Sequence, residues 1–247
     1  MTWGPGVEPA PGQRNSRDKT FTLDLEGRAV ALRVRRNVRA RRLVLTIDTA
    51  GGGVVVTVPD RVAVREGVEL ARSKAGWILN CLDALPPRTP FADGAIVPVL
   101  GVGHRVRHCP GRRGTVWRED GEIVVAGRPE HLARRLTDWL RRTARREITA
   151  RVADKAARLG RTPGRVTIRD TRSRWGSCSA DGDLSFSWRL VMMPEEVLDY
   201  VVAHEVAHLA YRGHGPRFWG AVARLTDDPD GARAWIRRHG EAMHRYG

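Results

Sequence analysis

The stretch VVAHEVAHLAYRGHGPRFW, Val201 to Trp219, places two histidines and a glutamate within an apolar run and adds a third histidine six residues later. At 3.6 residues per turn, His204, Glu205 and His208 lie on one face of a helix. The neighbouring face is apolar and suits a protein core, since it carries Leu198, Val202, Val206 and Leu209. The stretch therefore predicts a helix that packs on one face and presents polar groups on another.

The spacing of these polar residues is that of a zinc site. His204 and His208, four residues apart, can direct both imidazoles to one ion, and Glu205 leans over the same point without ligating it. This is the HExxH arrangement. His214 is too far round a continuing helix, but the glycines on either side of it would permit the chain to turn back. We therefore expect His214 to be the third ligand of one zinc ion per chain.

Three protein ligands leave one position of a zinc ion open for water, as in catalytic zinc sites. Zinc lowers the pKa of such a water towards about 7. Glu205 can accept its proton, direct hydroxide to a polarised carbonyl and pass the proton to the leaving amine. The predicted activity is that of a zinc metallopeptidase that hydrolyses a peptide or protein substrate.

Segments upstream predict the frame around this helix. Pro194, followed by two glutamates, starts the helix, because proline suits the first position and acids suit the positive end. Two predicted strands, residues 166–170 and 182–193, flank a polar loop. Before them, apolar residues at helical spacing predict a long helix from Pro129 to the C-cap residue Gly160.

The residues before position 129 favour β-structure. Apolar segments with partial alternation, broken by glycine, predict strands at residues 21–27, 29–36, 41–48, 52–59, 97–108, 115–119 and 121–127. Helical spacing predicts one helix at residues 64–85. The segment PPRTP, Pro86 to Pro90, then marks a linker or a subdomain edge.

Together these segments predict an α+β fold. A small β-rich N-terminal part, residues 20–126, is followed by a catalytic part, residues 127–247, with a long helix, a short sheet and the HExxH helix. Residues 1–19 mix proline, glycine and charge and predict a disordered tail. The tail contains no apolar run long enough for a signal peptide or a membrane span.

The composition also limits the class of protein. A chain of 247 residues, 41% of them hydrophobic, can bury a substantial core. Its three cysteines, Cys81, Cys109 and Cys178, are far apart and odd in number. This argues against a disulfide framework or a four-cysteine zinc site and favours a reducing, cytoplasmic location.

The charge makes nucleic acid an alternative partner. The formal net charge of +15 would attract polyanions, and the segment from Arg28 to Arg42 holds seven arginines and no acid. Against this, the chain has only three lysines, so arginine is used almost everywhere, as the codon bias of a GC-rich genome would produce. Blocks of like charge are also commonly solvated faces.

The segment RSRWGSCSADGDLSFSWRLVMMPEEVLDYVVAHEVAHLAYRGHGPRFW, Arg172 to Trp219, resembles the signature of the YgjP-like metallopeptidases, which are relatives of SprT-type zincins. The resemblance covers about residues 20 to 245 and is more specific in this segment than upstream. It implies that His204, His208 and His214 are zinc ligands and that Glu205 is the catalytic acid and base. Ser187 departs from the family, which often has asparagine before the tryptophan.

Several residues near the motif allow two interpretations. Trp175 and Cys178 either shape the cleft or belong to a buried structural loop. An oxyanion stabiliser besides zinc is expected, with Tyr211, Arg212 and Arg174 as candidates.

The strand from Leu184 to Met192 either pairs with an extended peptide along its edge or is an interior strand. His239 and His244 have neither ligand spacing, so both are expected at the surface.

Two classes of function therefore remain open. The first is a zinc peptidase of α+β architecture. The second is a nucleic-acid-binding module in which zinc is structural and the arginines contact the nucleic acid. A combined version, a protease acting on DNA-associated proteins, is suggested by the SprT kinship and the charge.

Overall fold

The structure, a computed structural model, describes residues 7–9, 18–49, 51–171 and 174–247. The chain forms two compact units, Met1–Pro86 and Pro87–Gly247. The linker predicted at Pro86 to Pro90 lies at this division, whereas the boundary predicted at residues 126 and 127 lies inside the second unit. Of the predicted disordered tail, Val7–Pro9 form a strand and Asp18 begins another; the remainder lies outside the described residues.

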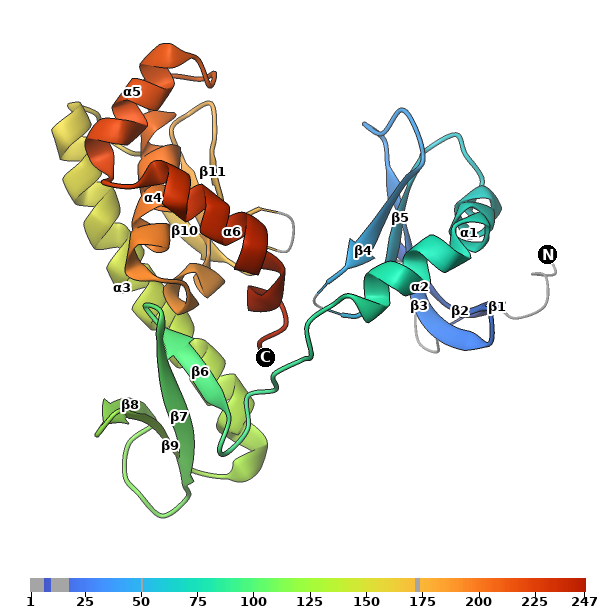
Figure 1. Cartoon of the computed structure of the whole chain (residues 1–247), viewed down its shortest axis with the longest axis horizontal. Helices are drawn as coiled ribbons and strands as arrows, with labels where there is room; N and C mark the ends of the chain where they lie inside the picture. The colour runs from blue at the N-terminus through green and yellow to red at the C-terminus, as the bar shows by residue number, and fades with distance from the viewer. Residues whose placement is uncertain (1–6, 10–17, 50, 172–173) are drawn as a thin grey trace. The chain divides into compact units, whose positions relative to one another are not determined.

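The N-terminal unit is a five-stranded sheet with two helices (Figure 1). Its strand order is β1-β2-β3-β5-β4, in which β3 and β5 are parallel and the other neighbours are antiparallel. The elements are β1 (Val7–Pro9), β2 (Asp18–Leu25), β3 (Arg28–Asn37), β4 (Val44–Asp48), β5 (Gly53–Pro59), α1 (Val64–Ser73) and α2 (Ala75–Asp83). The single helix predicted at residues 64–85 is thus two helices that meet at Lys74.

Alternation along the strands builds the core of this unit. Leu32 and Val34 of β3 are buried, and so are Val56 and Val58 of β5, all within one apolar cluster. Helix α1 packs closely over them, because a Cβ atom at Gly67 would lie 3.0 Å from a methyl carbon of Val58. Glycine therefore sets how near the helix approaches the sheet.

The arginine-rich segment consists of β3 and the loop after it. Arg28, Arg33 and Arg36 form ion pairs with aspartates of the same unit. Three of the seven arginines therefore pair with acids of their own unit. This favours the interpretation of the segment as a solvated face over the one that it binds nucleic acid.

The C-terminal unit holds two further sheets and the remaining helices (Figure 1). Its elements are β6 (Ile96–Val99), β7 (Val102–Cys109), β8 (Val116–Glu119), β9 (Glu122–Ala126), α3 (Leu132–Leu159), β10 (Val166–Arg169), β11 (Gly176–Cys178), β12 (Leu184–Ser187), α4 (Glu195–Ala207), α5 (Pro216–Leu225) and α6 (Pro229–Met243). Short 3-10 helices lie at Pro129–His131 and Trp188–Met192. The predicted long helix is confirmed, with Gly160 as its left-handed C-cap.

The first sheet of this unit repeats the strand arrangement of the N-terminal unit. The orders β2-β3-β5-β4 and β6-β7-β9-β8 each contain an antiparallel hairpin, a parallel pair and an antiparallel edge strand. Both hairpins turn through two residues at positive φ, Glu26-Gly27 and Leu100-Gly101, as two-residue type I′ turns require. A helix follows each sheet, α1 in the first case and α3 in the second.

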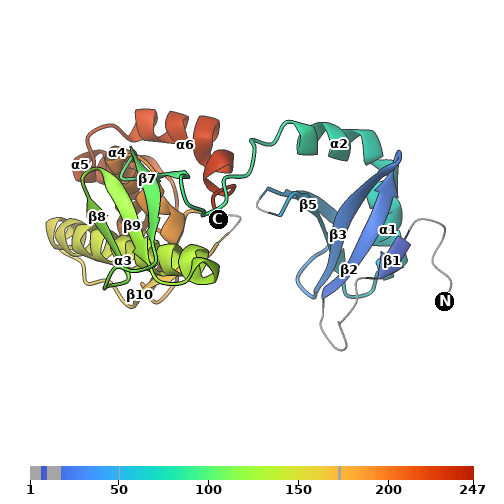
Figure 2. The same ribbon diagram turned by 90° about the horizontal axis from the view of Figure 1, so that it is seen from below.

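Helix α3 connects the sheet to the helices that carry the histidines. Near its start, Arg135 donates to the carbonyl of Ala126 at the end of β9. Near its end, Lys155 is 3% exposed, and its Nζ lies 2.8 Å from Oδ1 of Asp199 on α4. The same ammonium donates to the carbonyl of Leu225 at the end of α5. One buried lysine therefore joins three helices. These helices, α3, α4 and α5, are neighbours in the C-terminal unit (Figure 2).

The third sheet has the order β10-β12-β11, so β12 is interior and β11 is an edge strand. The strand predicted at residues 182–193 was too long, because the chain passes into a 3-10 helix after Ser187, whose hydroxyl accepts the N–H of Arg189 at 3.3 Å. The interior alternative for this strand is the one observed. Strand β11 lies in the segment predicted to be a loop.

The observed order of sheets and helices confirms the predicted α+β class, with β-structure first and a helical part after it. In the described part of the chain, no helix is both long enough and apolar enough to cross a membrane.

Candidate metal centre

Helix α4 holds the first two histidines and the glutamate. Glu195 and Glu196 occupy its first turn, as the sequence predicts. Pro194, predicted at the first helical position, is the N-cap residue one position earlier. Its start is fixed by the β6–β7 turn, since a Cβ atom at Gly101 would lie only 2.9 Å from Cα of Pro194. The helix is buried along most of its length and ends at Ala207, so His208 is its C-cap residue.

His214 reaches the other two histidines because the chain reverses directly after α4. The N–H groups of Leu209 and Tyr211 donate to carbonyls of the last turn, and α5 begins at Pro216. The expectation that flanking glycines enable this reversal is wrong, because neither Gly213 nor Gly215 is among the glycines with positive φ. The reversal is made by the backbone turns at Leu209 and Tyr211.

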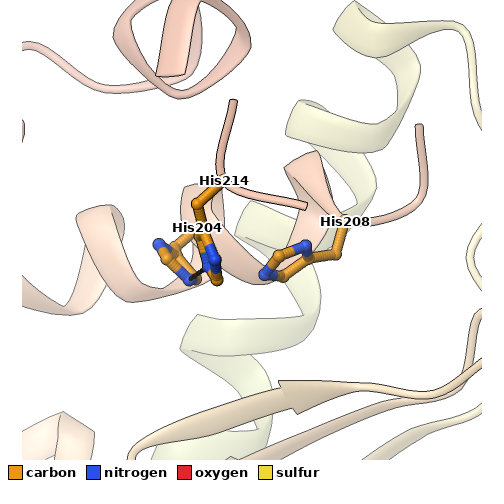
Figure 3. A group of neighbouring side chains, drawn as sticks. All are labelled: His204, His208 and His214. Carbon is orange, nitrogen blue, oxygen red and sulfur yellow. Dashed lines mark hydrogen bonds between the residues drawn. The ribbon is translucent and has the colours of Figure 1, made fainter. Parts of the chain in front are cut away.

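The three imidazoles converge on one point, as Figure 3 shows. One nitrogen from each of His204, His208 and His214 lies within 4.8 Å of the others. The Nε2 atoms of His204 and His214 are 3.3 Å apart. Two nitrogens bound tetrahedrally to one zinc at about 2.0–2.1 Å would be about 3.4 Å apart, so this separation fits a shared ion.

The tautomer of His208 also suits a metal ligand. Its Nδ1 lies 2.9 Å from the backbone carbonyl oxygen of Tyr211, which can only accept a hydrogen bond. Nδ1 therefore carries the proton and the neutral ring presents the lone pair of Nε2. Burial, and then the neighbouring histidines, lower the pKa of His204 to about 4, and burial also lowers the pKa of His208. Both rings are neutral near pH 7, as metal binding requires.

Phe218 of α5 packs against all three imidazoles. Its ring centroid lies 5.0 Å from that of His204, 4.6 Å from that of His208 and 4.7 Å from that of His214. The side chain is 1% exposed, so it anchors the return segment in the core, as the sequence predicts. Its simultaneous contact with the three rings was not predicted.

Glu205 is 7% exposed and lies against the edge strand β11. A Cβ atom at Gly176 would be 2.5 Å from Cγ of Glu205, so only glycine fits there. Burial raises the pKa of Glu205 to about 7, and the positive charge of Arg174 acts in the opposite direction. A carboxyl group with a pKa near neutrality can both accept and donate a proton.

A pocket of about 330 Å³ lies in front of these groups, between β11 and the three histidines. Of the three predicted oxyanion stabilisers, Arg212 lines this pocket and is held by a hydrogen bond to the carbonyl of Ala180. Tyr211 lines a different pocket, and Arg174 lies beyond β11.

Cys178 and Trp175, for which the sequence allowed two interpretations, have different surroundings in the structure. Cys178 lines the pocket, and burial raises the pKa of its thiol. Trp175 instead stacks on His244, with ring centroids 4.4 Å apart, and serves packing. The surface position expected for His244 is wrong, since this ring is 8% exposed, whereas His239 is exposed.

Sequence reasoning therefore missed β11 and the close contact of Gly176 with Glu205. A Gly-Ser-Cys segment has no apolar alternation that could reveal a strand. The available signal was the glycine itself, which can mark a close approach of backbone to another group.

Comparison with known proteins gives one family. The model of the YgjP-like metallopeptidase domain matches residues 41–239. No curated protein matches the chain. Among solved structures, the metallopeptidase zymogen of Pyrococcus abyssi abylysin is 21% identical, covers 38% of this chain and 93% of its own, and has a TM-score of 0.34. The assignment therefore rests on the family model.

Proposed function

The chain belongs to the YgjP-like metallopeptidase family, and on that premise we propose that it hydrolyses peptide bonds with one zinc ion held by His204, His208 and His214. Glu205 is the proposed general base and acid. The observation that carries this proposal is the convergence of three imidazoles beside a buried carboxyl group in one open pocket.

Zinc bound there would supply a Lewis acid that polarises the scissile carbonyl and makes water acidic. The chain's own groups account for the remaining steps. Glu205 accepts a proton from the attacking water and donates it to the leaving amine, a role that its position in the wall of the pocket beside the histidines allows. Arg212 lines the same pocket and is the proposed stabiliser of the negative charge that develops on the carbonyl oxygen.

The edge strand β11 offers a way to hold the substrate. Gly176 and Cys178 line the pocket beside Glu205, and among the described strands β11 pairs only with β12. An extended peptide that adds to the other side of β11 would pass in front of the histidines. Backbone hydrogen bonds would then give affinity that depends little on sequence, and side-chain contacts would give specificity.

The decisive experiment compares wild type with Glu205→Gln, which keeps the shape of the side chain but cannot accept a proton near neutral pH. Zinc content should stay close to one ion per chain, while hydrolysis of a casein-like substrate should fall at least about a hundredfold. Activity per bound zinc is measured with and without a chelator.

His214→Ala supplies the matched test of the metal site. It should weaken zinc binding sharply, because only two protein ligands would remain. If zinc is structural in a nucleic-acid-binding module, Glu205→Gln will alter stability or zinc affinity and leave any trace hydrolysis unchanged. Equal activities of wild type and Glu205→Gln per bound zinc would reject the peptidase mechanism.

We also propose a cytoplasmic location, since the three cysteines are unpaired.

A further inference from the structure

The outer face of the β10-β12-β11 sheet has a floor of small hydroxyl residues. Register places Thr167, Ser185 and Ser177 side by side across the three strands, so they lie on the same face. Leu184 and Phe186 of β12 are fully buried and point to the opposite face, towards the core. The outer face is therefore polar and lacks bulky side chains along this row.

Three arginines surround this floor. Arg165 and Arg169 lie two residues before and after Thr167, so alternation puts them on the outer face, and Arg174 precedes β11. Together with the floor they line a cavity of about 410 Å³, which we call the arginine hollow. Its size suits one or two side chains.

The charge of the arginine hollow is largely uncompensated. Across the described ranges, no carboxylate forms an ion pair with Arg165, Arg169 or Arg174, and all three are exposed. Asp183 also lines the hollow, but its Oδ1 accepts the backbone N–H of Arg165 at 2.7 Å. Asp170 nearby is paired with Arg189 and Arg141. The hollow thus presents three guanidinium groups against one carboxylate.

The hollow is continuous with the pocket of the metal centre. Both are lined by Ser177, Cys178 and Ser179, which belong to or directly follow the edge strand β11. The histidines lie on one side of this strand and the arginines on the other. A peptide held at the histidines can extend along β11, where its side chains can enter the hollow.

We propose that the arginine hollow is a substrate subsite for aspartate or glutamate side chains, so that the peptidase prefers acidic segments next to the bond that it cleaves. This inference rests on the proposed function. Guanidinium groups bind carboxylates with paired, charge-assisted hydrogen bonds, and the hydroxyls of the floor can donate as well. Continuity with a peptidase site favours a peptide over a nucleic acid as the occupant, and the volume is too small for a duplex.

The test uses two pools of fluorescent peptides of about twelve residues, random except for two neighbouring positions that are Glu in one pool and Gln in the other. Binding is measured to the full-length, zinc-loaded Glu205→Gln protein at about 0.15 M salt. The Glu pool should bind about fivefold more tightly, as expected for a few exposed ion pairs. In the background of Glu205→Gln, the added pair Arg165→Gln and Arg169→Gln should abolish this advantage. Arg174 is left unchanged because its charge acts on Glu205.

The matched control carries Arg142→Gln and Arg145→Gln in the same Glu205→Gln background. Both arginines are exposed on α3, so this control has the same net charge as the Arg165 and Arg169 variant. The advantage of the Glu pool should survive there. Equal binding of the two pools, or an equal loss in both double variants, would overturn the proposal. A single-stranded oligonucleotide is the third probe; if the Arg165 and Arg169 changes weaken its binding and not that of the Glu pool, the hollow is a nucleic-acid site.

Cleavage of the same pools by wild type separates this inference from the proposed function. Cleavage without preference for the Glu pool leaves the peptidase and rejects the subsite. Preferential binding of the Glu pool without any cleavage leaves the subsite and rejects the peptidase. The absence of both rejects both.

Discussion

Gly176 and Glu205 make a close contact beside the metal centre. The glycine lets β11 approach the glutamate closely, and this approach removes the carboxyl group from water and raises its pKa. The same strand covers the pocket that the substrate would enter. One missing side chain therefore influences the position, the protonation and the surroundings of the proposed catalytic group.

Gly176→Ala should displace Glu205, because the new Cβ atom would lie 2.5 Å from its Cγ. We expect peptidase activity per zinc to fall at least about tenfold, since a displaced base loses its alignment. Zinc content should not change, because the atoms nearest to the new Cβ belong to Glu205 and not to a histidine. The control is Gly220→Ala on α5, where an added Cβ has nothing within 4 Å. Unchanged activity of Gly176→Ala would show that the strand moves away instead.

The buried carboxyl group also predicts a pH dependence in the metal-free protein. The pKa of Glu205 is raised to about 7 in the folded state, so its contribution to stability is full below its ordinary pKa of about 4.5 and is lost as pH rises through 7. Glu205→Gln does not titrate. Its free energy of unfolding relative to wild type should therefore increase from pH 5 to pH 8, by up to about 3 kcal/mol.

Urea unfolding in a chelator measures this difference at each pH. The lowered pKa of His204 acts on both proteins alike and cancels in the comparison. Bound zinc would lower the pKa of Glu205, so the zinc-loaded pair should show a smaller pH dependence. A difference that stays constant with pH in the metal-free pair would mean that Glu205 is solvated there.

At the scale of elements, local signals predicted most of the helices and strands. The HExxH spacing, Pro194 and the C-cap Gly160 are signals that a few neighbouring residues carry, and the observed helices follow them. The break at Lys74 and the short length of β12 could not be predicted, because tertiary contacts override similar apolar patterns. The role of β11 depends on pairing with β12, which its own three residues do not reveal.

Lys155 of α3 contacts both α4 and α5, so Lys155→Ala should destabilise the protein by about 2 kcal/mol. It leaves the Leu225 carbonyl without its donor, although Arg151 still lies near Asp199. Arg134→Ala, which breaks an exposed ion pair on the same helix, should cost at most about 0.5 kcal/mol. Denaturant unfolding of both variants checks this; equal losses would show that the buried lysine has no special role.

At the scale of the whole molecule, the two units have separate cores. One apolar cluster lies within residues 21–82 and the other within residues 91–243. The sequence marked the division through its prolines but placed the main boundary forty residues later, because strands before a helix suggested a separate β-rich part. Their packing against α3 is a long-range contact that periodicity does not encode.

A fragment of residues 87–247 should therefore fold without the N-terminal unit and bind one zinc ion. All three histidines, Phe218 and the apolar cluster around α3 lie within it. Circular dichroism, cooperative thermal unfolding and zinc analysis of the fragment provide the measurement. An unfolded fragment, beside a full-length chain that folds normally, would show that the second core depends on the first unit.

The repeated sheet arrangement gives α3 a mechanical role. Helix α1, ten residues long, packs on its own sheet, whereas α3, with 28 residues, continues past the sheet and contacts α4 and α5 with its second half. This continuous helix therefore fixes the angle, about its own axis, between the sheet at its start and the helices α4 and α5 at its end. A single residue inserted midway would turn the histidine-bearing half by about 100° relative to the sheet, while seven residues would restore the phase to within about 20°. Only insertions close to a whole number of helical turns should therefore keep the sheet and the histidine-bearing helices aligned.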